Sequence, residues 1–149
     1  MKIAIGSEHA GTEYRLRLSE ELQKIGYEVI EIAETEERKG YPAVAEKTAE
    51  YVVDRQVDLG ILICGTGIGM CMAAGKIPGI RAALCADSYM GEMAKKHNNA
   101  NMIIFGSRVI GFENMMHVLK TFLQEKYEGG RHEVRLNALK ELEDKYSRC

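Results

Sequence analysis

An uninterrupted apolar run, Leu59–Cys64, ends in a cysteine and is followed by glycines at alternate positions, Gly65, Gly67 and Gly69. Such a run predicts a strand buried on both faces, which is typical of a parallel sheet covered by helices. The glycines allow the following backbone to turn sharply and to present bare N–H groups. In open α/β sheets ligands bind at the carboxyl ends of strands, so the Cys64 thiol is expected at the edge where a ligand would bind.

Strand-like and helix-like segments alternate along almost the whole chain. In addition to Leu59–Cys64, the pattern predicts strands at Lys2–Gly6, Tyr27–Ile32, Ile80–Cys85 and Asn101–Phe105. Helices are predicted from a cap at Thr12 to about 25, and over 42–56, 70–76, 88–97, 112–127 and 131–146. Right-handed crossovers then give a three-layer α/β/α, Rossmann-like sandwich with a five-stranded parallel sheet and an extra C-terminal helix. We expect one domain over residues 1–149.

The order of the strands is not determined by this pattern. Two unusual loops, 7–11 and 64–69, follow the first and third strands. If these strands are neighbours, as in the common doubly wound order, both loops flank one crevice.

Composition restricts the partners and the compartment. The net charge is −2 and no block of five like charges occurs, which argues against nucleic acid or a membrane surface as a partner. The first residues form a strand-like run rather than a signal peptide, and the apolar stretches are too short to span a bilayer. The four cysteines have neither C-x-x-C pairing nor metal-like spacing with histidine, so we expect reduced thiols, no metal and a cytoplasmic location.

Several residues have both a chemical and a structural interpretation. A strand-end thiol such as Cys64 is either a reactive group or a small buried apolar side chain. The glycine loop matches neither the P-loop nor the dinucleotide fingerprint, so we expect no nucleotide cofactor; its N–H groups suit an oxyanion, unless it serves only tight packing. Cys71 and Cys85 are interpreted as structural and Cys149 as part of a frayed terminus.

A second set of candidates is basic. His97 at a helix end and His9, beside Glu8, could carry protons near neutral pH or serve only as surface charges. His9 could also form a forked-donor site for a phosphate monoester together with arginines, namely Arg108, Arg131 and Arg135. Helix 131–146 follows a completed α/β unit, and it packs either on a partner subunit or back on its own sheet.

Many of these residues stand in stretches that resemble the ribose-5-phosphate isomerase B group, which includes galactose-6-phosphate and allose-6-phosphate isomerases. The matching stretches, in the family's order, are 2–6 with 9–11, 41–42, 63–69, 79–82, 97–98, 101, 105–111 and 127–132. The resemblance implies an aldose–ketose isomerase that needs no metal or cofactor and works through an enediolate. It also implies a homodimer whose sites take residues from both protomers, and leaves open whether two dimers associate further.

The resemblance also implies residue roles. Cys64 matches the base that moves a proton between C1 and C2, and the loop with Gly65, Gly67 and Gly69 matches the one that stabilises the enediolate oxygen. Thr66 and His97 match residues that open the sugar ring. The remaining matches are substrate contacts at Glu8, His9, Tyr41 and Asn98, and phosphate contacts at His9, Arg108, Arg131 and Arg135.

The chain departs from the family pattern at Glu8, Gly40, Gly75 and Asn99. Glu8 is one methylene longer than the usual Asp and would intrude on a sugar hydroxyl site. Ribose 5-phosphate is the leading substrate, and because of Glu8 other pentose or hexose phosphates are alternatives. A sugar-phosphate-binding subunit without catalysis is a further alternative. A cysteine phosphatase is disfavoured, because Met70 stands where its C-x5-R loop needs arginine. Met70 also stands where a subgroup without the cysteine carries a glutamate base, which supports Cys64 as the base.

Overall fold

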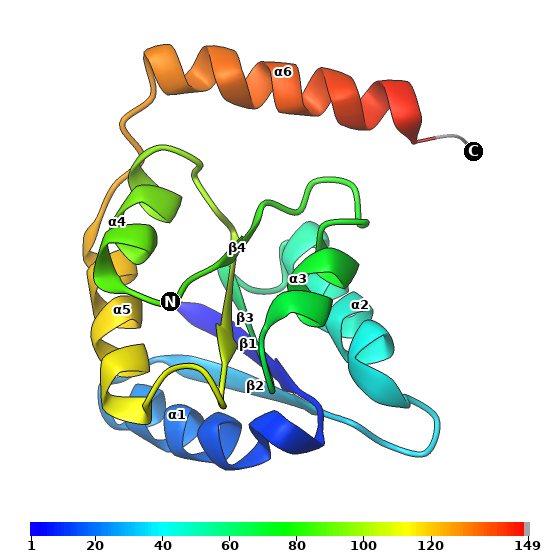
Figure 1. Ribbon diagram of the computed structural model, residues 1–149, viewed down its shortest axis with the longest axis vertical. Coiled ribbons are helices and arrows are strands. Elements are labelled where there is room, and N and C mark those ends of the chain that lie inside the picture. The colour runs from blue at the N-terminus through cyan, green and yellow to red at the C-terminus, as the bar shows by residue number, and fades with distance from the viewer. Residues whose placement is uncertain (148–149) are drawn as a thin grey trace.

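The five strands form one parallel sheet in the order β2-β1-β3-β5-β4 (Figure 1). The structure is a computed structural model that describes residues 1–147. The strands are β1 (Lys2–Ser7), β2 (Glu28–Ala33), β3 (Leu59–Cys64), β4 (Ala82–Leu84) and β5 (Met102–Gly106). The helices are η1 (His9–Gly11), α1 (Thr12–Lys24), α2 (Gly40–Val53), α3 (Ile68–Ala74), α4 (Ser88–Lys96), α5 (Phe112–Gln124) and α6 (Arg131–Tyr146). The predicted α/β class, parallel sheet and C-terminal helix are confirmed.

Helices cover both faces of the sheet because successive strand side chains point to opposite faces. Along β3, Ile61 and Ile63 pack with α1, α4 and α5, whereas Leu62 and Cys64 pack with α2 and α3. All six residues of β3 are buried. The central strand is therefore enclosed by two apolar clusters, and only its carboxyl end opens towards a possible ligand.

Strands β1 and β3 are direct neighbours, with Ser7 in register with Ile63. The loops that follow them therefore meet at one edge of the sheet, which is where the crevice between them is expected. The sheet places β5 between β3 and β4.

Some predicted element boundaries are wrong. Thr12 has helical dihedrals, φ −58° and ψ −47°, so it is the first residue of α1, and Gly11 takes the N-cap position. The strand predicted over 80–85 is limited to Ala82–Leu84, where β4 pairs with β5. Helices α2 and α3 each begin two residues earlier than predicted, and α5 ends at Gln124. Within residues 1–147 no helix is both long and apolar enough to cross a membrane.

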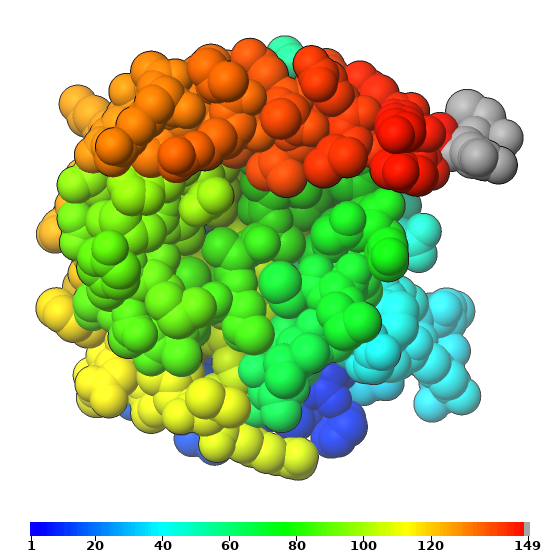
Figure 2. Space-filling view, turned by 45° about the horizontal axis from the view of Figure 1, so that its top comes forward, coloured from blue at the N-terminus to red at the C-terminus, as the bar shows by residue number. Residues whose placement is uncertain are grey.

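Helix α6 makes few contacts with the rest of its own chain. It lies across the end of the molecule opposite to the carboxyl ends of the strands, and it forms a raised band on the surface (Figures 1 and 2). Its apolar side chains face solvent, with Val134 70% and Tyr146 67% exposed. Of the two expected positions, packing of α6 back on its own sheet is therefore not what the structure has.

Candidate active site

The Cys64 side chain lies at the carboxyl end of β3 and accepts a hydrogen bond from the Gly67 backbone N–H, with an N–Sγ distance of 3.1 Å. Gly67 has φ +80°, a left-handed conformation that L side chains rarely adopt. This turn folds the loop back over the thiol. Cys64 is thus a buried sulfur with a backbone donor aimed at it, which is an arrangement suited to a thiolate.

The other residues of the glycine loop are enclosed by predicted substrate contacts. A Cβ added at Gly65 would lie 3.4 Å from Nη1 of Arg108, and one added at Gly69 would lie 2.9 Å from Cε2 of Tyr41. The Arg108 guanidinium and the Tyr41 ring therefore border the loop on two sides. The Thr66 hydroxyl accepts a hydrogen bond from Ile68 N at 3.3 Å, and the residue itself is exposed.

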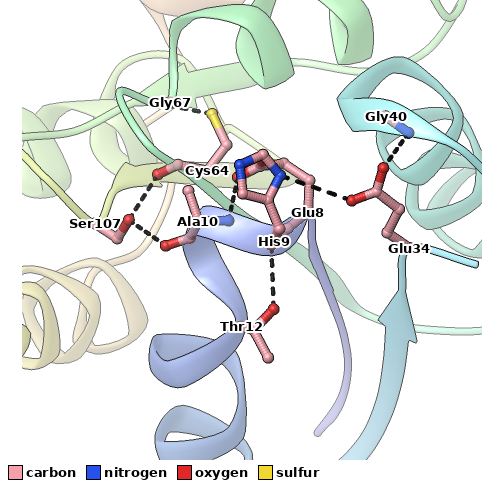
Figure 3. A network of polar contacts seen from close by, with 9 residues as sticks. All are labelled: Glu8, His9, Ala10, Thr12, Glu34, Gly40, Cys64, Gly67 and Ser107. Atoms are coloured by element: carbon pink, nitrogen blue, oxygen red, sulfur yellow. Dashed lines mark hydrogen bonds and ion pairs between the residues drawn. The ribbon is translucent and has the colours of Figure 1, made fainter.

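Ser107 connects the three strand ends that meet at this edge. Its backbone N–H donates to the Cys64 carbonyl at 2.8 Å, and its hydroxyl contacts the carbonyls of Ala10 at 2.7 Å and Cys64 at 3.2 Å (Figure 3). The turn after β1, the end of β3 and the end of β5 are thereby held in one arrangement.

The Glu8 carboxylate is folded back onto its own turn. Oε1 accepts from Ala10 N at 2.9 Å, and Oε2 lies 2.7 Å from His9 Nδ1. Glu34 lies 3.9 Å from the same nitrogen and accepts from the Gly40 N–H at the start of α2 (Figure 3). Two carboxylates thus face His9, whose ring is otherwise exposed and directed outward.

The remaining predicted residues gather in a second cluster at α4 and α6. A cavity of about 400 Å³ lies between the end of α4 and α6, lined by His97, Asn98, His132, Arg135, Leu136, Ala138, Leu139 and Leu142. The His97 ring stacks on the ring of His132 with centroids 4.0 Å apart and an interplanar angle of 13°. Arg131 lies beside this pair and its Nε donates to His132 Nε2 at 3.4 Å.

The two clusters lie at opposite ends of the strands, one at the carboxyl ends and the other at the amino ends. Cys64 ends a strand, whereas His97 ends α4, which runs back from the carboxyl end of β4 to the amino end of β5. A six-residue strand spans about 17–20 Å, so His97 does not meet the thiol of its own chain. In Figure 1, α6 lies at one end of the molecule and the loop after β3 at the other. Each chain therefore carries two separate halves of the predicted site.

This combination of fold and residues has clear relatives. The model of the ribose/galactose isomerase family matches residues 3–139. The chain belongs to this family. Ribose-5-phosphate isomerase B of Escherichia coli K12 is 40% identical over 145 residues, with 97% of each chain covered. A relative from Pectobacterium atrosepticum named D-erythrulose-4-phosphate isomerase is 41% identical over 132 residues, with 87% of each covered. The solved structure of Clostridium thermocellum ribose-5-phosphate isomerase B gives a TM-score of 0.94 at 44% identity, covering 99% of this chain and 100% of that chain.

The cysteines of this member of the ribose/galactose isomerase family lie in different surroundings. Burial raises the pKa of Cys85 to about 12 and also raises the pKa of Cys71, so both thiols stay protonated at neutral pH. Cys149 lies outside the described residues. Cys64 differs from both in its place, because its sulfur lies at the carboxyl end of β3 and accepts from the Gly67 N–H.

Sequence reasoning gave His132 and Glu128 no role, although both contact His97. His132 is 4% exposed, and Glu128 Oε2 lies 3.6 Å from His132 Nε2 and 3.9 Å from His97 Nε2. The signal for both was their place in the matching stretch 127–132. Glu34 and Ser107 were also missed; Ser107 lies in the matching stretch 105–111, whereas nothing in the pattern pointed to Glu34.

His97, Glu128 and His132 are close enough to be considered as metal ligands. A metal ion binds in the plane of an imidazole, and the two rings are stacked in nearly parallel planes. Arg131 also donates to the nitrogen of His132 that such an ion would need. This geometry favours a hydrogen-bonding cluster over a metal centre.

Proposed function

We propose that this chain is an aldose–ketose isomerase of phosphorylated sugars that interconverts ribose 5-phosphate and ribulose 5-phosphate. The observation that carries the proposal is the buried Cys64 sulfur within hydrogen-bond distance of Gly67 N, at the edge where the ends of β1 and β3 lie side by side. Family membership supplies the reaction class, and the site supplies a base with an oxyanion loop beside it.

The chemistry requires a base near carbon and donors near oxygen. As a thiolate, Cys64 removes the proton from C2 of the open-chain aldose. The C2 electron pair forms the C1–C2 double bond, and the carbonyl electrons move to O1, where the glycine loop N–H groups stabilise the charge. After a proton moves from O2 to O1, the thiol returns its proton to C1 and the ketose forms.

The site is completed by a second copy of the chain in a homodimer. His97 and Asn98 lie too far from Cys64 of their own chain, and α6 leaves its apolar side chains uncovered. A two-fold dimer brings the α4–α6 cluster of one copy to the crevice of the other, twice. His97 of one copy and Thr66 of the other then open the furanose ring, while Asn98 and Tyr41 contact the sugar.

The phosphate is bound by basic residues from both copies: His9 and Arg108 from one, and Arg131 and Arg135 from the other. Arg131 and Arg135 are four residues apart on α6 and both are exposed. Because this group is remote from C1 and C2, its binding energy holds the open-chain sugar over Cys64. The expected cytoplasmic location stays a prediction.

Mixing two inactive variants tests the shared site. Cys64→Ala and His97→Asn are each expected to lose conversion of ribose 5-phosphate. After mixing and subunit exchange, heterodimers regain one intact site out of two, so about a quarter of native activity returns for random pairing. Stronger inorganic phosphate binding by the Cys64→Ala variant than by an Arg131→Ala variant would support the phosphate assignment. An active Cys64→Ala variant, or a mixture without gain, would refute the mechanism or the sharing.

A four-carbon sugar phosphate is the second candidate substrate. The observation in its favour is the relative named D-erythrulose-4-phosphate isomerase, which is 41% identical to this chain. Rates with erythrose 4-phosphate, ribose 5-phosphate and allose 6-phosphate, measured for the native protein and for Glu8→Asp, decide between them. Binding of all three sugars without solvent-proton exchange at C2 would instead favour a non-catalytic binding subunit.

A further inference from the structure

The His97 side chain is held by groups that have no part in the proposed reaction. His97 forms the C-cap of α4, where its backbone N–H donates to the Met93 carbonyl at 2.9 Å. One face of its ring is covered by the buried ring of His132, 4.0 Å away in the first turn of α6. Since residues at a helix end have freedom of side-chain rotation, this stacking restricts the orientation of His97.

Glu128 fixes the stacked pair to the end of α4. Its backbone N–H donates to the Lys96 carbonyl at 3.0 Å, and its Oε1 lies 3.3 Å from Lys96 Nζ. Its other oxygen faces both imidazoles, 3.6 Å from His132 Nε2 and 3.9 Å from His97 Nε2. The connection between α5 and α6 is therefore attached to the residue directly before His97.

Neighbouring groups shift the pKa values of Glu128 and His132. Its hydrogen bond with Lys96 holds the pKa of Glu128 below its usual value, so the carboxylate is ionised at neutral pH. Burial lowers the pKa of His132, and the neighbouring charges of His97, Arg131 and Arg135 lower it further, whereas the Glu128 carboxylate raises it. The His132 ring is thus neutral at neutral pH, and Arg131 Nε donates to its Nε2.

We propose that Glu128 and His132 are positioning residues for His97: the stacked ring and the facing carboxylate hold the His97 imidazole in the orientation needed to open the ring of a sugar bound by a second copy. This inference rests on the proposed function, because the contacts of His132 and Glu128 with His97 matter only if His97 opens the sugar ring. A proton-transfer group held in place contributes roughly 10² to 10⁴ in rate, so loosening it is costly even when binding is unchanged.

Ring opening is separable from proton transfer at carbon. Ribose 5-phosphate closes a furanose ring through its C4 hydroxyl, whereas ribulose 5-phosphate has no free C5 hydroxyl and stays open. Deuterium exchange at C1 of ribulose 5-phosphate therefore needs Cys64 but no ring opening. Loss of a residue that acts through His97 therefore slows the conversion of ribose 5-phosphate and leaves deuterium exchange into ribulose 5-phosphate unchanged.

The test compares Glu128→Gln with the matched control Glu92→Gln. Glu92 also pairs with Lys96, at 3.1 Å. Replacing Glu92 leaves the Glu128 carboxylate facing the two imidazole rings. For Glu128→Gln we expect kcat with ribose 5-phosphate to fall about tenfold, with exchange into ribulose 5-phosphate and the Kd for inorganic phosphate within about twofold of native. Glu92→Gln is expected to match the native protein in all three measurements. His132→Phe, which keeps a flat ring, should retain more activity than His132→Ala.

NMR of the His97 ring protons without substrate gives a readout that does not depend on catalysis. The native protein should show His97–His132 contacts and one ring orientation, and Glu128→Gln should show averaging. Equal losses in both reactions and in phosphate binding would mean that Glu128 only places α6 and would overturn the proposal, as would an unchanged His97 ring. A native protein without isomerase activity would refute the proposed function, and the NMR comparison would still decide whether Glu128 and His132 hold His97.

Discussion

Gly67→Ala should strongly destabilise the protein, because this position combines two separate costs. The left-handed φ of +80° costs an L residue about 1–2 kcal/mol. The new Cβ would also lie 2.4 Å from Leu84 Cδ1 and 3.1 Å from the Phe105 carbonyl carbon. Overpacking of this kind costs about 1–3 kcal/mol. We therefore expect a loss of about 2–5 kcal/mol in the free energy of unfolding, a large share of a typical domain's stability.

Two other glycines separate these costs. Gly26 has φ +91° with no heavy atom within 4 Å of an added Cβ, so Gly26→Ala measures the backbone cost alone, about 1 kcal/mol. Gly65 is not among the glycines with positive φ, and its Cβ would lie 3.4 Å from the flexible Arg108 guanidinium, so Gly65→Ala should change stability by less than about 0.5 kcal/mol.

The assay is urea denaturation of the three variants at one protein concentration, since subunit association shifts apparent stability. If Gly67→Ala loses no more free energy of unfolding than Gly26→Ala, Leu84 and the β5 backbone shift enough to accommodate the methyl group. The close packing of the loop behind Cys64 would then be refuted as the reason for glycine at this position.

Three further predictions concern other parts of the molecule. The pKa of His132 is lowered in the fold, so the stability that comes from its neutral form is complete above about pH 6.5 and is lost as the pH falls through the lowered pKa. Between about pH 7.5 and 5.5, the urea midpoint of His132→Phe should therefore fall less than that of the native protein. Parallel curves of midpoint against pH would contradict this. Arg15→Met leaves Ser7 and Glu31 without their guanidinium partner and should lower the free energy of unfolding, measured by urea denaturation, by about 2–3 kcal/mol. Lys24→Met removes the exposed ion pair with Glu21 and should lower it by less than about 0.5 kcal/mol. Equal losses would refute a role for burial. Leu139→Asp, on the exposed face of α6, should convert the proposed dimer into monomers by light scattering and speed hydrogen exchange along α6, whereas an unchanged mass would exclude α6 from the interface.

The elements that the sequence predicts well are those whose signal is local. The all-apolar run before Cys64 and the glycines after it need only nearest-neighbour geometry, so the strand and the turn that follows it are predicted from the pattern alone. The start of α1 was misplaced by one residue because Gly11 and Thr12 are both acceptable caps, and tertiary contacts of the η1 turn decide between them. The insertion of β5 between β3 and β4 is a long-range property, which no local pattern specifies.

The candidate residues come from patterns and from the family resemblance, whereas the distances between them depend on the fold. Within one chain the direction of α4 keeps His97 away from Cys64, which agrees with a site that takes residues from two protomers. The burial of His132 was not predicted, because it depends on the end of α4, which lies against the first turn of α6 only in the folded chain. Glu34 was missed because its partners, His9 and Gly40, are joined only when β1 and β2 are paired.

The position of α6 links stability to function. Helix α6 has sixteen residues, and an isolated helix of that length is marginal in water. Its contacts with its own chain are concentrated at the two ends, through His132 stacked on His97 and through Glu143, which accepts from Gly79 N at 2.9 Å. In the proposed homodimer, a second copy covers the exposed apolar residues between these contacts. Dimer formation would then order the same helix that carries Arg131 and Arg135 and covers His97, so that a monomer would lack both a stable α6 and half of each proposed site.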